Sequence, residues 1–269
     1  MGISKQAVNK YQHRLETETL RLLGLIPLAE QLREAHPGCG VEKMYDLINP
    51  DFIGRDKFIE FMMDAGFRLK RPCNGQRTTV SGKVVYANLI KGMIVSAPST
   101  IWQSDITYFR IGERWYYGVF IIDVYTKIIV GYKVSDSMRA TANYEALAMA
   151  LRLFPAPRIH HSDRGSQYSC LKYTGKLKAN GCLISMSLTA QDNAYAERIN
   201  QTIKYEYLNY WKPKTFEALK RSVKKAVNNY NQVRPHNNLN RMSPNSYYEQ
   251  CKNDPKNMKP ITIFDNTIT

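Results

Sequence analysis

The sequence predicts an α/β protein in which a mixed sheet is covered by helices, preceded by a small helical region. Two observations predict the sheet. Residues 101–134 contain three successive runs rich in β-branched and aromatic side chains, and helix-like and strand-like segments alternate after them. A third observation predicts the helical region, because apolar residues recur at helical spacing between residues 25 and 65.

The first segment is expected to hold three short helices. Apolar residues at positions 25, 28, 29 and 32 share one helical face, and this run stops at His36-Pro37-Gly38. A second helix is expected over residues 41–48 and a third over about 55–65, with Gly66 as its C-cap. Three short helices joined by tight turns can form a helix-turn-helix DNA reader or an ordinary helical bundle, and the sequence leaves both open.

The remaining elements follow from local composition. The strand-like runs predict a meander, and Pro155-Ala156-Pro157 ends the helix that follows it. The expected strands are 101–111, 115–124, 127–134, 158–162 and about 183–187, and the expected helices are 142–153, about 170–179, about 193–210 and about 215–232.

Charge points to a polyanionic partner. Lysine and arginine number 38 against 23 acidic residues, a net charge of +15, and nucleic acid is the commonest partner of such a chain, although a solvated basic surface also explains it. A hydrophobic share of 43% suffices for a packed core. The longest nearly apolar stretch, residues 116–122, is too short to cross a bilayer. Five scattered cysteines without a secretory leader favour a cytoplasmic protein without structural disulfides.

Three carboxylates stand out by placement. Asp105 lies within a strand-like run, Asp163 follows a short strand, and Glu197 falls in the first turns of a long helix. Taken singly, each has an ordinary explanation: a satisfied core acid, a turn former and a charge on a helix surface. Taken together, they form a set of hard oxygen ligands from separate elements, which two-metal phosphoryl transfer with Mg²⁺ requires.

Several motifs around these acids resemble one family. In order, they are Trp102 to Tyr108, Ile122 to Gly131, His161 to Tyr168, Asp192 to Asn200, Tyr230 to His236 and Ser243-Pro244. They resemble the second-frame (OrfB) product of two-frame bacterial insertion-sequence transposases, the IS-three group, which is related to retroviral integrases. The similarity covers roughly residues 25 to 250, and the N-terminal helices resemble the family's helix-turn-helix more loosely.

The resemblance implies an RNase H-like core in which Asp105, Asp163 and Glu197 are the catalytic acids and hold Mg²⁺ or Mn²⁺, with two ions expected. It implies cleavage and strand transfer of double-stranded DNA at transposon ends, a homo-oligomer on DNA, and an upstream-frame (OrfA) protein or fusion as a further partner. It also implies a bacterial protein that associates with the nucleoid when bound to DNA. The four predicted regions are a helix-turn-helix-like DNA-binding domain (1–70), a basic linker able to follow a phosphate backbone (71–98), the catalytic core (99–232) and a C-terminal tail (233–269).

DNA contacts are expected from several basic and polar residues. The family usually has a basic residue seven positions after the helix acid, and Lys204 stands there, on the same helical face as Glu197. An ordinary surface lysine is the alternative. The other candidates are Arg198, His161, Gln167, and the i,i+4 pairs Lys220 with Lys224 and Arg221 with Lys225. His161 could instead pack on its strand, Gln167 could face solvent, and the lysine pairs could form a hydrated stripe.

Other candidate sites are assigned structural roles or excluded. Asp123 is expected to be structural rather than a metal ligand, and Trp102 is expected in the core rather than as a stacking platform. Retroviral integrases carry an N-terminal His/Cys zinc site. The histidines and cysteines at positions 13, 36, 39 and 73 lack the two close pairs that such a site needs, so no structural zinc is expected. No phosphate-binding P-loop is present, and ATP use is not expected.

The interval between two acids departs from the family. Between Asp163 and Glu197 lie 33 residues, where the family usually has 35, and the shortening falls at 187–192, where the usual glycine is missing. Loops tolerate length changes better than regular elements do. The segment that guides DNA is therefore expected to differ. Two alternatives to an active transposase stay open: an impaired copy that only binds DNA, and an RNase H-like nuclease that cannot join strands.

Overall fold

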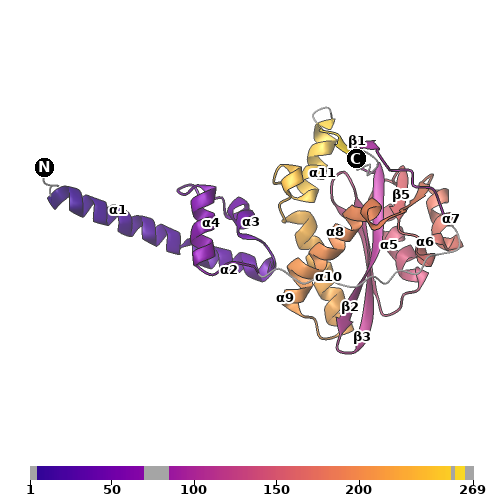
Figure 1. The fold of residues 1–269 in the computed structure, drawn as a ribbon, viewed down its shortest axis with the longest axis horizontal. Coiled ribbons are helices and arrows are strands. Elements are labelled where there is room, and N and C mark those ends of the chain that lie inside the picture. The colour runs from indigo at the N-terminus through magenta and orange to yellow at the C-terminus, as the bar shows by residue number, and fades with distance from the viewer. Residues whose placement is uncertain (1–4, 70–84, 256–257, 264–269) are drawn as a thin grey trace. The chain divides into compact units, whose positions relative to one another are not determined.

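The computed structural model describes residues 5–69, 85–255 and 258–263, which fall into two compact units (Figure 1). The smaller unit is Met1–Pro72 and the larger is Cys73–Thr269. Most of the expected linker, residues 70–84, lies outside the described residues.

The smaller unit consists of helices. These are α1 (Lys5–Leu23), α2 (Leu25–Ala35), α3 (Val41–Ile48) and α4 (Arg55–Asp64). The last three confirm the predicted helices to within a residue or two, and their buried apolar faces form one core around Met44, Phe58 and Met62. Helix α1 was not predicted, because its apolar residues, such as Leu15 and Leu20, remain exposed and do not form a core-facing stripe.

The larger unit is built on a five-stranded sheet with the order β4-β3-β2-β5-β6. The strands are β2 (Ile101–Ile111), β3 (Arg114–Asp123), β4 (Ile129–Ser135), β5 (Ile159–Ser162) and β6 (Leu183–Met186). The first three are antiparallel, as the predicted meander requires, whereas β5 pairs parallel with β2, and β6 pairs parallel with β5. The mixed sheet predicted from the sequence is confirmed.

Helices cover both faces of this sheet. They are α5 (Ala140–Leu153), α6 (Ser166–Ser169), α7 (Leu171–Ala179), α8 (Ala194–Thr202), α9 (Asn209–Trp211), α10 (Phe216–Gln232) and α11 (Pro244–Asn253). Three short helical segments join them: the 3₁₀ turns η1 (Ala190–Asn193) and η3 (Asn237–Leu239), and the π-helical segment η2 (Ile203–Leu208). The helix predicted over about 193–210 is thus one run that changes from α to π geometry partway along.

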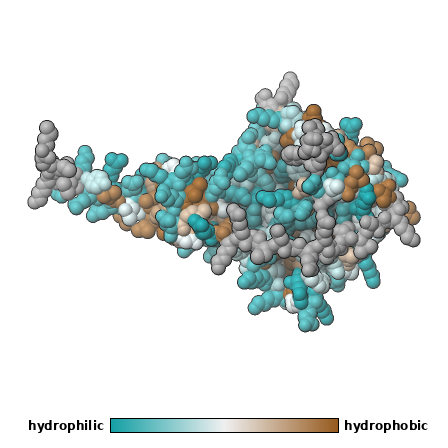
Figure 2. Space-filling model, viewed as in Figure 1, coloured by the Kyte–Doolittle hydropathy of each residue, from teal (hydrophilic) through white to brown (hydrophobic). Residues whose placement is uncertain are grey.

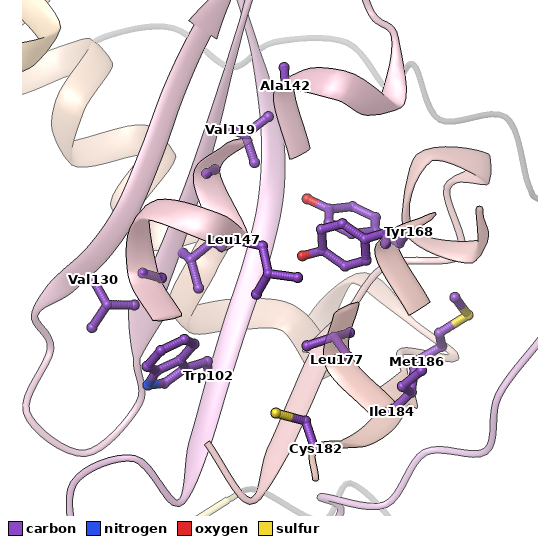
Figure 3. Close-up of a cluster of buried hydrophobic side chains, with 14 of the residues drawn as sticks. Trp102, Val119, Val130, Ala142, Leu147, Tyr168, Leu177, Cys182, Ile184 and Met186 are labelled. Atoms are coloured by element: carbon purple, nitrogen blue, oxygen red, sulfur yellow. The ribbon is translucent and has the colours of Figure 1, made fainter. Parts of the chain in front are cut away.

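Side chains that point alternately to the two faces of the sheet create two hydrophobic cores, one on each face. In β3, Val119 and Ile121 face one layer, in which Trp102 and residues of α5 and α7 are buried. Figure 3 shows Trp102, Val130, Leu147 and Leu177 in this cluster. Phe120 and Ile122 face the opposite layer, formed by α8, η2 and α10. Successive side chains of a strand point to opposite faces, so one hydrophobic strand supports both helical layers.

The contact between β4 and α5 is close because position 131 is glycine. A Cβ at Gly131 would lie 2.3 Å from the carbonyl oxygen of Ala146 and 2.9 Å from the Cβ of Ala150. Real side chains do not approach backbone so closely. Glycine therefore sets the separation between this helix and the sheet.

The residues after α10, predicted to be a tail, pack onto the larger unit. Leu239, Tyr247 and Ile263 are buried in a third cluster with Ile101 and Val124. A two-stranded sheet of β1 (Ile94–Val95) and β7 (Ile261–Thr262) connects the start of this unit to its end. Helix α11 and these two strands were not assigned from the sequence, because their apolar runs are too short to show a period.

The visible face of the larger unit in Figure 2 is covered mainly by hydrophilic side chains. Within the described residues, every helix is too short or too polar to cross a membrane.

Candidate active site

Two of the predicted acids lie side by side on neighbouring strands. Strands β2 and β5 are parallel, and Ser104 pairs with Ser162. The residues that directly follow this pair are Asp105 and Asp163. The register of the sheet therefore places both carboxylates at the carboxyl end of β5, where open α/β sheets usually hold their ligands.

The two carboxylates lie in an environment that disfavours their charge. Burial, the nearby Asp163 carboxylate and, to a smaller extent, Glu197 together raise the pKa of Asp105 to about 7. Burial also raises the pKa of Asp163. Two acids that are costly to ionise together form a site whose free energy falls when a cation binds between them.

Hydrogen bonds fix the orientation of both carboxylates. The amide Nδ2 of Asn200 donates to Oδ2 of Asp105 at 2.8 Å, and the backbone N–H of Gly165 donates to Oδ1 of Asp163 at 3.0 Å. Both bonds favour the ionised acids. Asn200 was missed by the sequence reasoning; its signal was its place one helical turn after Glu197 on α8.

Glu197 lies on the helix that contacts Asp105, but its carboxylate is exposed and accepts a hydrogen bond from Gln201 at 3.3 Å. Because residues three apart share a helix face, Glu197 lies one turn from the Asn200 that contacts Asp105. In the described part of the chain, no three acids, histidines or cysteines form a compact metal-ligand cluster. The structure thus brings Asp105 and Asp163 together and leaves Glu197 at the rim.

The side chain of Gln103, on β2, holds the start of α8 against that strand. Gln103 Oε1 accepts from the backbone N–H of Tyr195 at 3.0 Å, and its Nε2 donates to the carbonyl oxygen of Asp192 at 3.1 Å. Asn193 Nδ2 donates to the carbonyl oxygen of Ser104 at 3.0 Å. These bonds fix the helix that carries Glu197 relative to Asp105. The sequence reasoning missed this role of Gln103.

The shortened segment before α8 is compact. The carboxylate of Asp192 accepts from the backbone N–H groups of Leu188 and Thr189 at 2.8 and 2.9 Å, and Thr189 forms a capping box with it. Ser187 N–H donates to the carbonyl oxygen of Ser162 on β5. The loop that was expected to be shortened therefore closes by hydrogen bonding to itself and to the sheet.

Lys204 lies in η2, on the same helical run as Glu197. Burial lowers its pKa, and the nearby Asp105 opposes this effect. Its Nζ stands 5.9 Å from the ring centroid of Phe109 on β2. The ammonium group therefore lies near Phe109, four residues after Asp105 on β2, within range of the Asp105 charge.

Three other candidate residues are buried in the core of the larger unit. Asp123 is buried and accepts hydrogen bonds from Ser99, from the Thr126 N–H and from the Thr126 hydroxyl, as a structural acid does. Trp102 is fully buried, which confirms its expected place in the core. His161 is also fully buried, with Nδ1 2.8 Å from Ser185 Oγ, and burial lowers its pKa to about 4. The expectation that His161 touches a DNA phosphate is corrected, because a neutral buried ring cannot reach one.

The remaining DNA-contact candidates lie at the surface. Gln167 is half-buried near Asp163: a Cβ at Gly165 would lie about equally close to Gln167 Oε1 (2.9 Å) and Asp163 Oδ1 (3.0 Å). Arg198 is exposed on α8. The four basic residues of α10, Lys220, Arg221, Lys224 and Lys225, are exposed as well. Lys220 forms an ion pair with Glu217 at 2.8 Å, which reduces its availability to a phosphate.

A meander of three strands followed by two parallel strands, with paired carboxylates at the junction, defines an RNase H-like core of the integrase type. Known proteins agree with this class. Residues 95–191 and 184–244 match two models that are both described as integrase core domain. The integrase intasome of simian T-cell lymphotropic virus, solved with a PP2A regulatory subunit, shares the fold with a TM-score of 0.50 at 14% identity, over 81% of this chain and 73% of that one.

Curated relatives are closer in sequence. The transposase of insertion sequence IS629 from Shigella sonnei is 36% identical over 66% of this chain and 63% of its own length. An IS600 31 kDa protein, also from Shigella sonnei, is 33% identical over 75% of this chain and 77% of its own length. The chain belongs to the integrase-core family of insertion-sequence transposases, the IS-three group. It spans less than two thirds of the length of the IS629 protein.

Proposed function

We propose that this protein is a DNA transposase that cleaves and joins DNA at the ends of an insertion sequence, with Asp105, Asp163 and Glu197 as its catalytic acids. The observation that carries the proposal is the position of Asp105 and Asp163, each directly after the Ser104–Ser162 pair of the parallel strands β2 and β5, next to the helix that carries Glu197 and Asn200. Family membership supports the same activity.

The acid pair suits a divalent cation. Mg²⁺ and Mn²⁺ prefer carboxylate and amide oxygens, and both half-buried acids have raised pKa values that a bound cation would relieve. In the described structure the amide oxygen of Asn200 has no hydrogen-bond partner although it is buried, so a further oxygen donor lies unengaged next to Asp105. Asp105 and Asp163 would hold one ion, and Glu197 would complete a site for a second.

A bound cation would polarise the phosphodiester and favour the ionised form of an attacking water or hydroxyl. The protein's own groups supply positioning. Asn200 keeps Asp105 Oδ2 aimed by donating to it, and the Gly165 N–H does the same for Asp163. Lys204 would hold a phosphate of the DNA beside the acids.

The reaction consists of two displacements at phosphorus. Water attacks a phosphodiester at the transposon end and releases a 3′ hydroxyl. That hydroxyl then attacks a phosphodiester of the target, displaces the 3′ oxygen of the target strand and joins the transposon end to the target's 5′ phosphate. Both steps depend on alignment of nucleophile and leaving group, so a site held by strands and a fixed helix suits them.

The proposal extends to partners. Double-stranded DNA is the substrate, and a homo-oligomer assembled on two transposon ends would bring both ends to one target. An upstream-frame protein, or a fusion with it, would contribute additional DNA binding. Such a protein would act in the bacterial cytoplasm, on the nucleoid.

The test compares the parent protein with Asp163→Asn on duplex DNA that carries the ends of the parent element. We expect the parent to nick and join in Mg²⁺, and Asp163→Asn to lose both activities by several orders of magnitude while still binding the DNA. Glu249→Gln is the matched control, because Glu249 is exposed on α11 and its ion pair with Lys252 lies within that helix. Equal activity of the parent and Asp163→Asn would refute the proposal, and nicking without joining would limit it to a nuclease.

A further inference from the structure

A network of buried polar side chains connects the two strands that lead to the acid pair. Its four members are each at most 1% exposed: Ser104 on β2, His160 on β5, Tyr168 on α6 and Tyr173 on α7. The geometry points to a positioning function, in which the hydroxyl of Tyr168 sets the separation of Asp163 from Asp105 and thereby the affinity of the acid pair for a divalent cation. This inference rests on the proposed function, because a cation held by the two acids is part of that function.

Hydrogen bonds connect the four side chains into one chain. The hydroxyls of Ser104 and Tyr168 lie 2.9 Å apart, and either can donate. The Tyr173 hydroxyl lies 2.9 Å from Nε2 of His160. Burial raises the pKa of Tyr173, and a hydrogen bond with Ser104 opposes this effect, so Ser104 contacts both tyrosines. Buried polar groups that satisfy one another hold the elements that carry them in a single arrangement.

The network lies on the face of the sheet opposite to the face that carries Asp105. Ser104 is two residues after Trp102 on β2, so both side chains point into the layer of α5 and α7. The Asp105 side chain points the other way, toward α8, where it accepts a hydrogen bond from Asn200. Strand β2 is therefore attached to neighbouring elements from both faces at adjacent residues.

Both sides of Asp163 belong to the network. His160 precedes Asp163 by three residues, and Tyr168 follows it by five. Their bonds converge on Ser104, which directly precedes Asp105. The segments before and after one acid are thus connected to the immediate neighbour of the other acid.

Asp163 needs a restraint that the sheet does not provide. Strand β5 ends at Ser162, so Asp163 lies after the last pair of the ladder, whereas Asp105 lies within β2. The hydrogen bond from the Gly165 N–H to Asp163 is local, and it would move together with the turn. Two ionised carboxylates side by side repel each other. A connection from this turn back to β2 opposes that repulsion and keeps the acids together.

Tyr168 supplies this connection. Its backbone N–H donates to the carbonyl oxygen of Gly165 at 3.0 Å, which fixes its place relative to the turn. Its ring is buried in the core cluster (Figure 3) and packs edge-on against Tyr173, with ring centroids 5.5 Å apart. Burial and the carboxylates of Asp163 and Asp105 together raise the pKa of Tyr168. The hydroxyl therefore keeps its proton and lies within electrostatic range of both acids.

The affinity for a cation depends on the separation of the acids. Mg²⁺ requires nearly ideal octahedral geometry with oxygen ligands at about 2.0–2.1 Å, so two carboxylates that bind one ion tolerate little displacement. Groups that orient metal ligands without touching the metal typically contribute about 10- to 100-fold in affinity or activity. A hydrogen bond that only stabilised the core would leave cation binding by the folded protein unchanged.

The test measures binding of Mn²⁺ to the full chain without DNA, from the electron paramagnetic resonance signal of the free ion. We expect Tyr168→Phe, which removes only the hydroxyl, to bind Mn²⁺ about 10-fold more weakly. Half-maximal nicking should then require correspondingly more Mg²⁺, while binding of duplex DNA in EDTA stays unchanged.

The matched control is Tyr125→Phe. Tyr125 is also buried, and its hydroxyl donates to the carbonyl oxygen of Lys259 at 3.0 Å, in the cluster formed with the C-terminal residues. This variant loses an equivalent hydrogen bond of a buried tyrosine, but it should keep the Mn²⁺ affinity of the parent.

Ser104→Ala approaches the same bond from the other strand. We expect it to weaken Mn²⁺ binding at least as much as Tyr168→Phe does. The double variant should bind Mn²⁺ no more weakly than Ser104→Ala alone, because both changes remove one shared bond. Thermal unfolding followed by tryptophan fluorescence sets a titration temperature at which each variant is folded.

Three results would overturn the inference: parent affinity in both Tyr168→Phe and Ser104→Ala, an equal loss in Tyr125→Phe, or additive losses in the double variant. Asp163→Asn is titrated in parallel. Mn²⁺ binding that depends on Asp163 but not on Tyr168 overturns this inference alone, and a parent that binds no Mn²⁺ removes the cation site together with it. Binding that depends on Tyr168 in a parent that does not nick overturns the catalytic assignment alone.

Discussion

Replacing Arg234 by methionine is expected to destabilise the larger unit by about 3 kcal/mol. Arg234 forms a two-pronged ion pair with Glu206, at 2.7 Å from Nε and 2.6 Å from Nη2, and its side chain is only 8% exposed. Burial lowers the pKa of Arg234, but the Glu206 carboxylate outweighs this and raises it overall. Removal of the guanidinium leaves a carboxylate without its cation.

The magnitude follows from burial. Breaking a buried ion pair by removing one partner costs about 3–5 kcal/mol, and Glu206 is 23% exposed, so water compensates part of the loss and the lower end applies. For a unit of this size, about 3 kcal/mol corresponds to a fall in Tm of roughly 6–12 °C. Intrinsic fluorescence can follow this unit alone, because the three tryptophans, Trp102, Trp115 and Trp211, all belong to it.

A double-mutant cycle separates the ion pair from general packing. Glu206→Gln combined with Arg234→Met removes both charges, so we expect the double variant to be more stable than Arg234→Met by at least 1 kcal/mol. If Arg234→Met unfolds within 1 kcal/mol of the parent, or if the two changes are additive, the reasoning from burial fails at this pair.

The other predictions concern packing, titration and helix position. Gly131→Ala should lower the free energy of unfolding by about 1–3 kcal/mol in urea titrations, because its methyl group would collide with α5, whereas Gly175→Ala, in open space on α7, should raise it by up to about 1 kcal/mol. Burial lowers the pKa of Lys127 to about 7, so above that pH the unfolded chain binds more protons than the folded chain does. The free energy of unfolding should therefore rise between pH 7 and 10, by up to about 1.4 kcal/mol per pH unit. The same pH slope in the parent and in Lys127→Met would contradict this. Gln103→Leu should cost about 2 kcal/mol by removing the bonds to the start of α8, and should reduce nicking more than DNA binding; retention of full nicking activity would exclude a positioning role.

The fold could be predicted from the sequence wherever local patterns were long enough. The meander, the alternating segments after it and the three short helices at residues 25–65 each show a clear period. Helix α1 lacks a buried stripe, and β1 and β7 contain two residues each, so neither kind of element carries a periodic signal. The packing of α11 onto Val124 and Tyr125 depends on contacts between residues far apart in the chain, which a local pattern does not report.

The sequence predicted the acids of the candidate site better than the residues that position those acids. Asp105 and Asp163 could be located because a charge within or directly after a hydrophobic strand is conspicuous. Asn200 and Gln103 are neutral amides, and their roles depend on tertiary hydrogen bonds that no spacing reveals. His161 illustrates the opposite error: its position two residues before Asp163 suggested a phosphate contact, but alternation along β5 turns it into the core, against Ser185.

Two distant motifs converge on the same helical run. At its start, Gln103 and Asn193 attach α8 to β2, next to Asp105. Toward the other end of the run, Arg234 forms an ion pair with Glu206 in η2, the segment that also contains Lys204. A helix held at both ends cannot shift along its axis without breaking one set of bonds. Glu197 lies between the two attachment points, so it is positioned both by Gln103 of the motif Trp102 to Tyr108 and by Arg234 of the motif Tyr230 to His236. Arg234 thus contributes to the site without touching it, and this contribution would be lost if the chain ended after α10.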